Sequence, residues 1–324
     1  MKKQNQQPIN HLFVKKILVS RPNHRLGNQI LMTPLLQEIE NKFPNASIYL
    51  FTKGKLSKQI FKNYKSITGH YNLPKKHFSE LFTYLSVWIK LAFSKFDLCI
   101  NCDVNSSSGR LSCVVPKSKL VINHEFDYSL FHISKKNSAH IAIKPVIDFR
   151  IFFQFSENIN TKIPKLDIKN TAEEKEYGKN ILLATKKEKN LKTICIFTNA
   201  TGKKSYDSPW WTAFLNEFEK NNSNYEIIEL LPFENTSKVN FKYPSIYSTD
   251  IREMAGIIEN VDYFITADCG VMHLACATNT TTIGLFKFNN IKKYSPYGNK
   301  NCGIMTHDLS PIEVYKKITK KITF

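Results

Sequence analysis

The sequence has no long apolar run, few acidic residues and no regular cysteine pattern. No stretch approaches the roughly eighteen apolar residues that a membrane-spanning helix needs. Lys15 and Lys16 interrupt the short apolar run near the amino terminus, which predicts a tail before a first strand and not a signal peptide. The seven cysteines are odd in number and irregularly spaced, which favours a reducing compartment. Cys99 and Cys102 have no second pair to complete a zinc site, so structural thiols are predicted and no metal.

The shortage of acidic residues leaves a large positive charge. Lys and Arg number 46 against 27 Asp and Glu, for a formal net charge of +19. Such a balance suits nucleic acid, an anionic membrane surface or an acidic glycolipid. The lysines are scattered and rarely alternate with aromatics, so no specific nucleic-acid partner is predicted. With 324 residues and 42% hydrophobic content, the chain should be globular and long enough for two domains.

Predicted strands and helices alternate along the chain, as in open parallel α/β sheets. Apolar, β-branched runs predict strands at residues 13–20, 47–52, 96–101, 119–123, 192–197, 225–231, 263–267 and 280–286. Amphipathic or apolar stretches predict helices at residues 30–42, 78–94, 140–155, 172–187, 250–260, 271–277 and 310–323. Residues 156–170 are polar and without periodicity, and we expect the domain boundary there.

Residues 262–288 form one predicted strand-turn-helix-strand unit. Asp268 is an N-cap type, Gly270 relaxes the turn, and His273 falls in the first helical turn. A helix that starts directly after a strand points its N–H groups at the sheet's carboxyl edge, which suits a phosphate. The alternative is that Asp268 is only a cap and His273 a core histidine.

Two polar loops follow other predicted strands. The first, residues 21–28, is cationic and lies where doubly wound folds keep their ligands. In the second, Thr198, Thr201 and Gly202 can donate hydrogen bonds, and Lys203 and Lys204 add positive charge. One of these lysines is predicted to contact a phosphate; the alternative is a solvated basic turn.

These stretches resemble glycosyltransferase family 9, the lipopolysaccharide heptosyltransferases. ADCGVMHLACA is similar to the signature D-[TS]-G-x-x-H-x-A-x-A, with Cys269 in place of the usual Thr or Ser; the matching residues are Asp268, Gly270, His273, Ala275 and Ala277. The first loop matches the family's pattern at Arg21, Leu26, Gly27, Ile30, Thr33 and Pro34. Lys204 followed by Tyr206 fits the family's K-x-W spacing.

The resemblance implies a GT-B-type α/β fold, with two Rossmann-like domains facing a central cleft. The expected domains are an acceptor-side domain at 1–160, a nucleotide-sugar domain at 161–309, and a final helix at 310–324 of a kind that often crosses back toward the first domain. The implied donor-site residues are Thr201, Gly202, Lys204, Asp268, Cys269, Gly270, Val271, Met272 and His273. The implied acceptor-side residues are Arg21, Arg25, Gly27 and Asn28.

The resemblance also implies an activity: inverting, metal-independent transfer of a heptose-like sugar to a lipopolysaccharide or other surface glycan. The donor would be a nucleoside diphosphate sugar, most simply an ADP-sugar, and no cofactor is implied. We expect a cytoplasmic protein that can contact the anionic inner face of the cytoplasmic membrane. Lys204 would assist the leaving group in this reaction.

The sequence departs from the family at the proton acceptor. The family's Asp after Gly27, which is thought to act as general base, is Asn28 here, and an amide has no useful basicity. His24 or Asp103 could replace it, Asn28 could only orient the acceptor, or catalysis could be lost. The alternative for His24 is a surface loop residue without a catalytic role. The last reading gives the alternative function, a non-catalytic protein that binds a sugar nucleotide or glycan.

Overall fold

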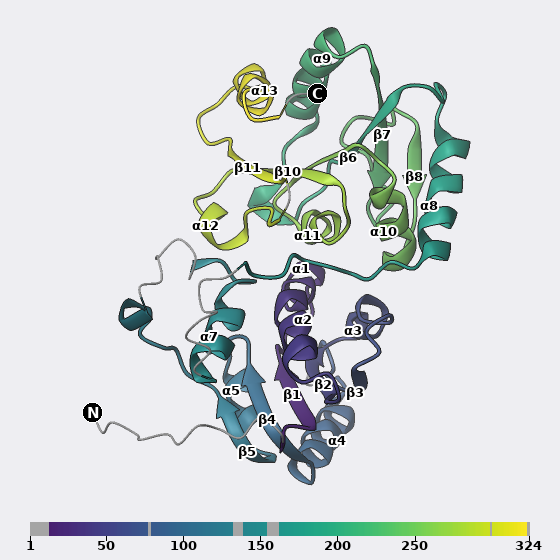
Figure 1. Cartoon of the computed structure of the whole chain (residues 1–324). Coiled ribbons are helices and arrows are strands. Elements are labelled where there is room, and N and C mark those ends of the chain that lie inside the picture. The colour runs from purple at the N-terminus through teal and green to yellow at the C-terminus, as the bar shows by residue number, and fades with distance from the viewer. Residues whose placement is uncertain (1–12, 77–78, 132–138, 154–161, 299, 323–324) are drawn as a thin grey trace. The chain divides into compact units, whose positions relative to one another are not determined.

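A computed structural model describes residues 13–76, 79–131, 139–153, 162–298 and 300–322. The chain divides into two compact units. Unit 1 comprises residues 1–24 and 32–164, and unit 2 comprises residues 25–31 and 165–324. The predicted boundary between residues 160 and 161 lies outside the described residues. Each unit contains a parallel sheet with helices, which confirms the predicted α/β class (Figure 1).

The described part of unit 1 forms a five-stranded parallel sheet in the order β3-β2-β1-β4-β5. Its strands are β1 (Lys16–Ser20), β2 (Ser47–Lys53), β3 (Ile67–Leu73), β4 (Lys95–Asn101) and β5 (Lys117–Ile122). The chain runs outward from β1 to β3 and then returns to β4 on the other side of β1. The carboxyl ends of β1 and β4 therefore form the switch point where ligands of such sheets bind.

Between β1 and β2 of unit 1, the chain forms two helices where the sequence predicts one. One helix over residues 30–42 was expected; α1 (Leu26–Ile30) and α2 (Thr33–Lys42) are separate, and Pro34 lies in the first turn of α2. Proline suits a helix start because it has no N–H to donate. The others are α3 (Leu56–Ile60), α4 (Leu81–Ala92), α5 (Ser107–Val114), the 3₁₀ turn η2 (Tyr128–Phe131) and α7 (Lys144–Phe152). Residues 78, 154 and 155 of two predicted helices lie outside the described residues.

The described part of unit 2 forms a six-stranded parallel sheet in the order β11-β10-β9-β6-β7-β8. Its strands are β6 (Lys192–Phe197), β7 (Tyr225–Leu231), β8 (Ser245–Tyr247), β9 (Tyr263–Ala267), β10 (Thr281–Phe286) and β11 (Cys302–Met305). The sequence predicted the four central strands. It missed β8 and β11 because these edge strands are short and only partly buried.

The helices of unit 2 contribute aromatic and aliphatic side chains to its core. They are α8 (Ala172–Thr185), the 3₁₀ turn η4 (Gly202–Lys204), α9 (Ser208–Asn221), α10 (Ile251–Glu259), α11 (Gly270–Cys276), α12 (Ile291–Tyr294) and α13 (Pro311–Thr319). The last helix, α13, packs against α9 within this unit, with Tyr315 edge-on to Phe218. None of the helices in the described ranges is long and apolar enough to cross a membrane.

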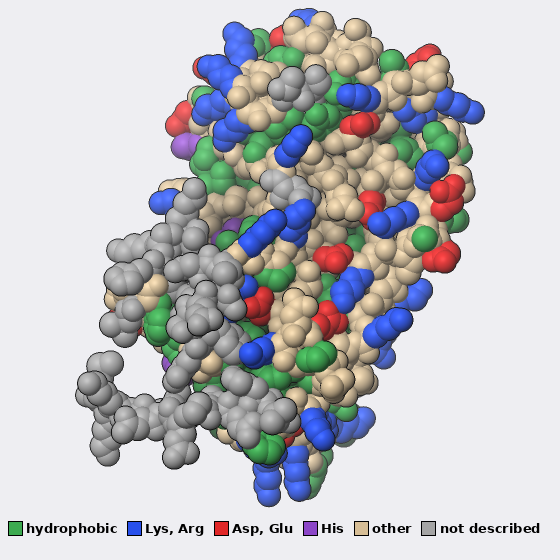
Figure 2. All heavy atoms as spheres, in the orientation of Figure 1, with side chains coloured by type: hydrophobic (Ala, Val, Ile, Leu, Met, Phe, Trp, Pro, Cys, Tyr) green, Lys and Arg blue, Asp and Glu red, His purple; other side chains and the backbone are tan. Residues whose placement is uncertain are grey.

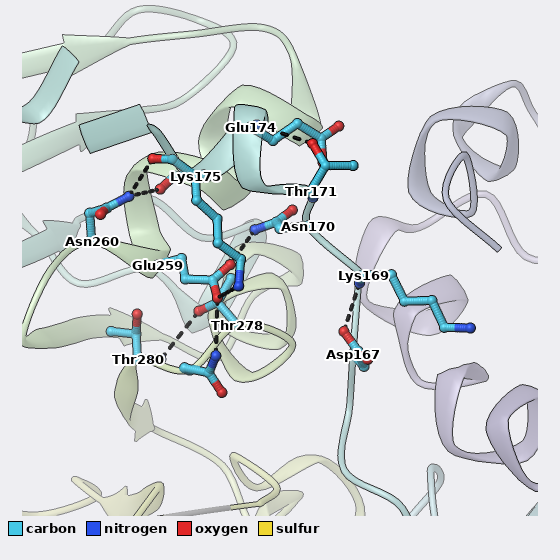
Figure 3. Close-up of polar contacts among 12 residues, drawn as sticks. Asp167, Lys169, Asn170, Thr171, Glu174, Lys175, Glu259, Asn260, Thr278 and Thr280 are labelled. Carbon is cyan, nitrogen blue, oxygen red and sulfur yellow. Dashed lines mark hydrogen bonds and ion pairs between the residues drawn. The ribbon is translucent and has the colours of Figure 1, made fainter. Parts of the chain in front are cut away.

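The segment that leads into α8 is held to unit 2 by polar contacts (Figure 3). Thr171 and Glu174 form a capping box at the start of α8. Glu174 also accepts hydrogen bonds from buried Arg252 of α10, whose guanidinium donates to the carbonyls of Ile168 and Lys169 as well. The carboxylate of Glu259 accepts from Asn170 and forms an ion pair with Lys175. One residue, Arg252, therefore joins two helices and the entering chain.

Candidate functional site

Three loops at the carboxyl ends of β6, β9 and β10 carry the polar residues of unit 2. The first contains η4 and Lys204, the second begins with Asp268, and the third contains Lys287 and Asn290. Because β10, β9 and β6 are neighbours in the sheet, these loops emerge at the same edge.

Lys204 and Asp268 are paired across two of these loops. Lys204 Nζ lies 2.5 Å from Asp268 Oδ2, and Asn290 Nδ2 donates to the same oxygen over 2.5 Å. The Asp268 side chain is 7% exposed, whereas that of Lys204 is 35% exposed. The carboxylate thus orients an ammonium that stays open to solvent, and an ammonium has three donors to share.

The predicted capping role of Asp268 is wrong. The residue at the N-cap of α11 is Cys269, and it makes no side-chain capping bond. Burial raises the pKa of the Cys269 thiol, an effect that its contact with the Thr266 hydroxyl partly offsets. Asp268 is therefore not used to start the helix, and its carboxylate serves the contact with Lys204.

The loop that carries Lys204 is fixed from two sides. Lys287 donates to the carbonyl of Ser205 over 2.6 Å and lies 4.6 Å from the ring centre of Tyr206. Thr198, which we expected to offer a hydroxyl to a ligand, instead donates it to buried Glu229 over 2.7 Å. Burial raises the pKa of the Glu229 carboxyl. The pairing with Asp268 distinguishes Lys204 from its exposed neighbour Lys203.

The remaining donor-side candidates of this loop and of α11 differ in exposure. Thr201 is exposed, and Gly202 has a φ of +60°, a conformation that glycine adopts without strain. Val271, Met272 and His273 are buried. These three side chains therefore contribute to the core of unit 2 as well as to the start of α11.

The two signature glycines pack against each other within unit 2. A Cβ at Gly27 of α1 would lie 2.6 Å from Cδ2 of His273 and 3.2 Å from Cα of Gly270. A Cβ at Gly270 would lie 3.1 Å from Cβ of Leu26. Only residues without a side chain allow α1 and α11 this close. Asn28, half-buried, follows Gly27 on α1, and exposed Arg25 is the N-cap residue of the same helix.

We expect the substitution Gly27→Ala to destabilise the protein, because the added methyl must displace the buried ring of His273. The expected loss of unfolding free energy is about 1–3 kcal/mol, the usual cost of overpacking. Urea unfolding would measure it, and the same change in a His273→Ala background is the control. Equal losses in the two backgrounds would contradict the contact.

Unit 1 carries the other predicted site residues. Arg21 follows β1, is buried, and donates to the carbonyl of Cys102 over a long 3.4 Å. Burial raises the pKa of the Cys102 thiol, and the negative charges of Asp103 and Asp148 raise it further. Burial raises the pKa of Asp148 to about 6, and Tyr128 donates to its carboxylate over 2.6 Å. Asp148 is an ionisable group at this edge of the sheet that the sequence did not point to.

A pocket of about 520 Å³ opens at the ends of β2 and β3 in unit 1. Its lining includes Lys55 at the N-cap of α3, Lys58 within α3 and Lys75 after β3. Exposed His24 lies beside this pocket. A Cβ built on Gly54, which is part of the pocket wall, would lie 3.5 Å from the Cβ of His24. The three lysines suit an anionic group.

No three His, Cys, Asp or Glu side chains in the described parts of the chain gather in a way that could hold a metal ion. The cationic groups near the carboxyl edges of the two sheets are Lys204 and Lys287 in unit 2 and the pocket lysines in unit 1.

The fold and these edges define a class of protein. Two units, each with a parallel Rossmann-like sheet, are the architecture of GT-B glycosyltransferases. The particular family follows from the sequence: the family model described as glycosyltransferase family 9 (heptosyltransferase) matches residues 84–322. The chain belongs to this family, and its class of activity is glycosyl transfer. The resemblance seen in the sequence motifs is confirmed.

Solved structures share the fold at low identity. A family 9 glycosyltransferase from Veillonella parvula DSM 2008 has a TM-score of 0.71 and 17% identity, over 95% of this chain and 90% of that one. The ADP-heptose heptosyltransferase II of E. coli has a TM-score of 0.64 and 13% identity, over 95% and 98%. E. coli heptosyltransferase WaaC with ADP has a TM-score of 0.66 and 14% identity, over 95% of this chain and 100% of that one. No curated protein matches the chain.

Sequence reasoning missed three residues of the unit 2 edge, namely Lys287, Asn290 and Tyr294. The ring of Tyr294 lies 6.3 Å from that of His273 and 5.7 Å from Lys204 Nζ. The sequence feature that could have indicated them is their position, because all three follow the strand β10 at its carboxyl end.

Proposed function

We propose that this chain transfers a heptose-like sugar from an ADP-sugar to a hydroxyl of a lipopolysaccharide or similar glycolipid, with inversion and without a metal. The observation that carries the proposal is the half-exposed Lys204, oriented by buried Asp268 and Asn290. A diphosphate leaving group develops negative charge, and a preorganised ammonium stabilises that charge without reorganising. Membership of the heptosyltransferase family supports the sugar, and the ADP bound by WaaC favours the nucleotide.

His273 would complete the donor site in this proposal. It is buried beside Tyr294, whose ring also faces Lys204, so the three side chains form one cluster. The donor-side set remains Thr201, Gly202, Lys204, Asp268, Cys269, Gly270, Val271, Met272 and His273.

The acceptor is assigned to unit 1. The lysine-lined pocket suits the phosphates or carboxylates of an acidic glycolipid, and charge complementarity supports this choice. Neighbouring His24 is the proton acceptor that we propose in place of the missing Asp, because a neutral imidazole has a basic nitrogen that an amide lacks. Asn28, with Arg21, Arg25 and Gly27, would orient the acceptor.

A second candidate function is donor binding without transfer, and Asn28 favours it. The two candidates predict opposite results for Asn28→Asp. An active natural protein with His24 as base should change its rate only modestly, whereas His24→Ala should lower it by about 10²–10⁴-fold. An inactive natural protein should gain activity when the Asn28→Asp substitution restores a proton acceptor.

The test compares the natural protein, Asn28→Asp and His24→Ala on a panel of nucleotide sugars that includes ADP-heptose, with an acidic glycolipid acceptor and EDTA throughout. ADP binding by calorimetry shows that each variant keeps its donor site. A silent natural protein beside a working Asn28→Asp variant would overturn the preference for a natural transferase. Activity that only Mg²⁺ or Mn²⁺ restores would overturn metal independence.

A further inference from the structure

The helix α4 of unit 1 has two apolar faces, of which only one is covered. Tyr84, Val87, Trp88 and Leu91 pack inward against the sheet, where Trp88 meets Phe51 with ring centres 5.1 Å apart. A second set of apolar side chains follows the opposite side of the helix at intervals of three and four residues: Phe82, Leu85, Ile89 and Phe93. Phe82 is 90% exposed and Phe93 is 84% exposed. A row of four large apolar side chains at this exposure marks an interaction surface.

The sequence on both sides of α4 is strongly basic. Between Lys53 and Lys95 the sequence has nine lysines and a single acidic residue, Glu80. The lysine-lined pocket adjoins the start of α4, since Glu80 and Thr83 belong to its wall. Figure 2 shows lysine and arginine side chains gathered around the end of unit 1 that carries α4 in Figure 1.

We infer that the exposed face of α4 binds the surface of an anionic lipid bilayer, with its aromatic side chains among the lipids and the surrounding lysines against the headgroups. Because the inner face of α4 is covered by the sheet, the outer apolar face and the lysines around it are what the helix offers to a membrane interface, where apolar side chains and basic residues bind together. Each lysine near an anionic leaflet adds to the attraction. A second copy of the chain is the poorer occupant, because a twofold contact through α4 would bring two lysine-rich surfaces together.

The consequence for the acceptor rests on the proposed function. A bilayer against α4 would lie next to the lysine-lined pocket, so a glycolipid could reach the pocket without leaving the membrane. Binding to lipid itself needs neither donor nor acceptor, so its test is separate from the test of transfer.

The experiment is co-sedimentation of the full chain with vesicles of phosphatidylcholine, alone or mixed with phosphatidylglycerol. We expect binding to the mixed vesicles, weakened by salt because the lysine attraction is screened. Phe82→Ser with Phe93→Ser should lower the affinity by about tenfold or more, as should Lys75→Glu with Lys76→Glu. The matched control is Phe233→Ser, which removes a 75% exposed phenylalanine from unit 2 and should bind as the natural protein does.

Three results would overturn the inference. The first is no binding to the mixed vesicles, and the second is binding that Phe82→Ser with Phe93→Ser leaves unchanged. The third is a dimer, seen by light scattering, that the same double substitution dissociates, since a second copy would then cover α4. Both phenylalanines are exposed, so circular dichroism should show unchanged folding and separate a lost surface from a lost fold.

Discussion

Replacing Lys204 by alanine should lower the rate of sugar transfer by about 10²–10³-fold, the usual effect of removing one preorganised group that stabilises developing charge. The substitution removes the ammonium and leaves buried Asp268 with its hydrogen bond from Asn290. Acceptor KM should change little, because the charge develops on the donor. Initial rates at saturating donor would measure the effect.

Lys203→Ala is the matched control for Lys204→Ala. Both lysines belong to the 3₁₀ turn η4, but Lys203 is exposed and has no ion pair with Asp268. We expect Lys203→Ala to keep nearly the full rate. A damaging Lys203→Ala with a silent Lys204→Ala would show that the neighbouring lysine contacts the diphosphate.

Replacing Arg252 by methionine should cost about 3–5 kcal/mol of unfolding free energy, the range for breaking a buried ion pair on one side. The side chains of Arg252 and Glu174 are 6% and 18% exposed, and the guanidinium also satisfies the carbonyls of Ile168 and Lys169. Its loss leaves a largely buried carboxylate and two backbone acceptors without this donor. Urea unfolding followed by circular dichroism would measure the change.

Lys175→Met is the control for Arg252→Met. Lys175 also pairs with a glutamate, Glu259, at 2.8 Å, but its side chain is 43% exposed. The Lys175 ammonium is open to solvent, and Glu259, although only 10% exposed, keeps the hydrogen bonds that Asn170 and Asn279 donate to it, so a loss of about 0–1 kcal/mol is expected. Equal losses in the two variants would show that burial of the cation does not distinguish the two pairs.

The sequence predicted the central strands of both sheets because buried parallel strands are continuous apolar runs. It predicted β6, β7 and β9 with the bounds that the structure has. It failed where tertiary contacts decide. The strand β3 contains Gly69 and His70 and has no apolar run, and it forms by pairing with β2.

For the candidate site, the sequence predicts features that depend on neighbouring residues but not contacts between residues far apart in the chain. A cap-type residue before a helix predicted that Asp268 would bond the first turn of α11, but its carboxylate meets Lys204, which lies much earlier in the chain. No periodicity encodes such a pair. The exposed face of α4 was not predicted, for the opposite reason. The sequence alone does not distinguish Phe82, Leu85 and Ile89 from core residues, and only the structure shows which side of the helix is covered.

The packing of α1 on α11 limits how this chain can be cut. Residues 25–31 belong to unit 2, although the chain before and after them belongs to unit 1. A fragment starting at Lys165 would contain every strand of the second sheet but would lack Leu26 and Gly27, and it would leave the surface of Gly270 and His273 bare. Expression of the two units as separate proteins therefore requires that residues 25–31 be removed from unit 1 and joined to unit 2, because no single break in the chain divides the units.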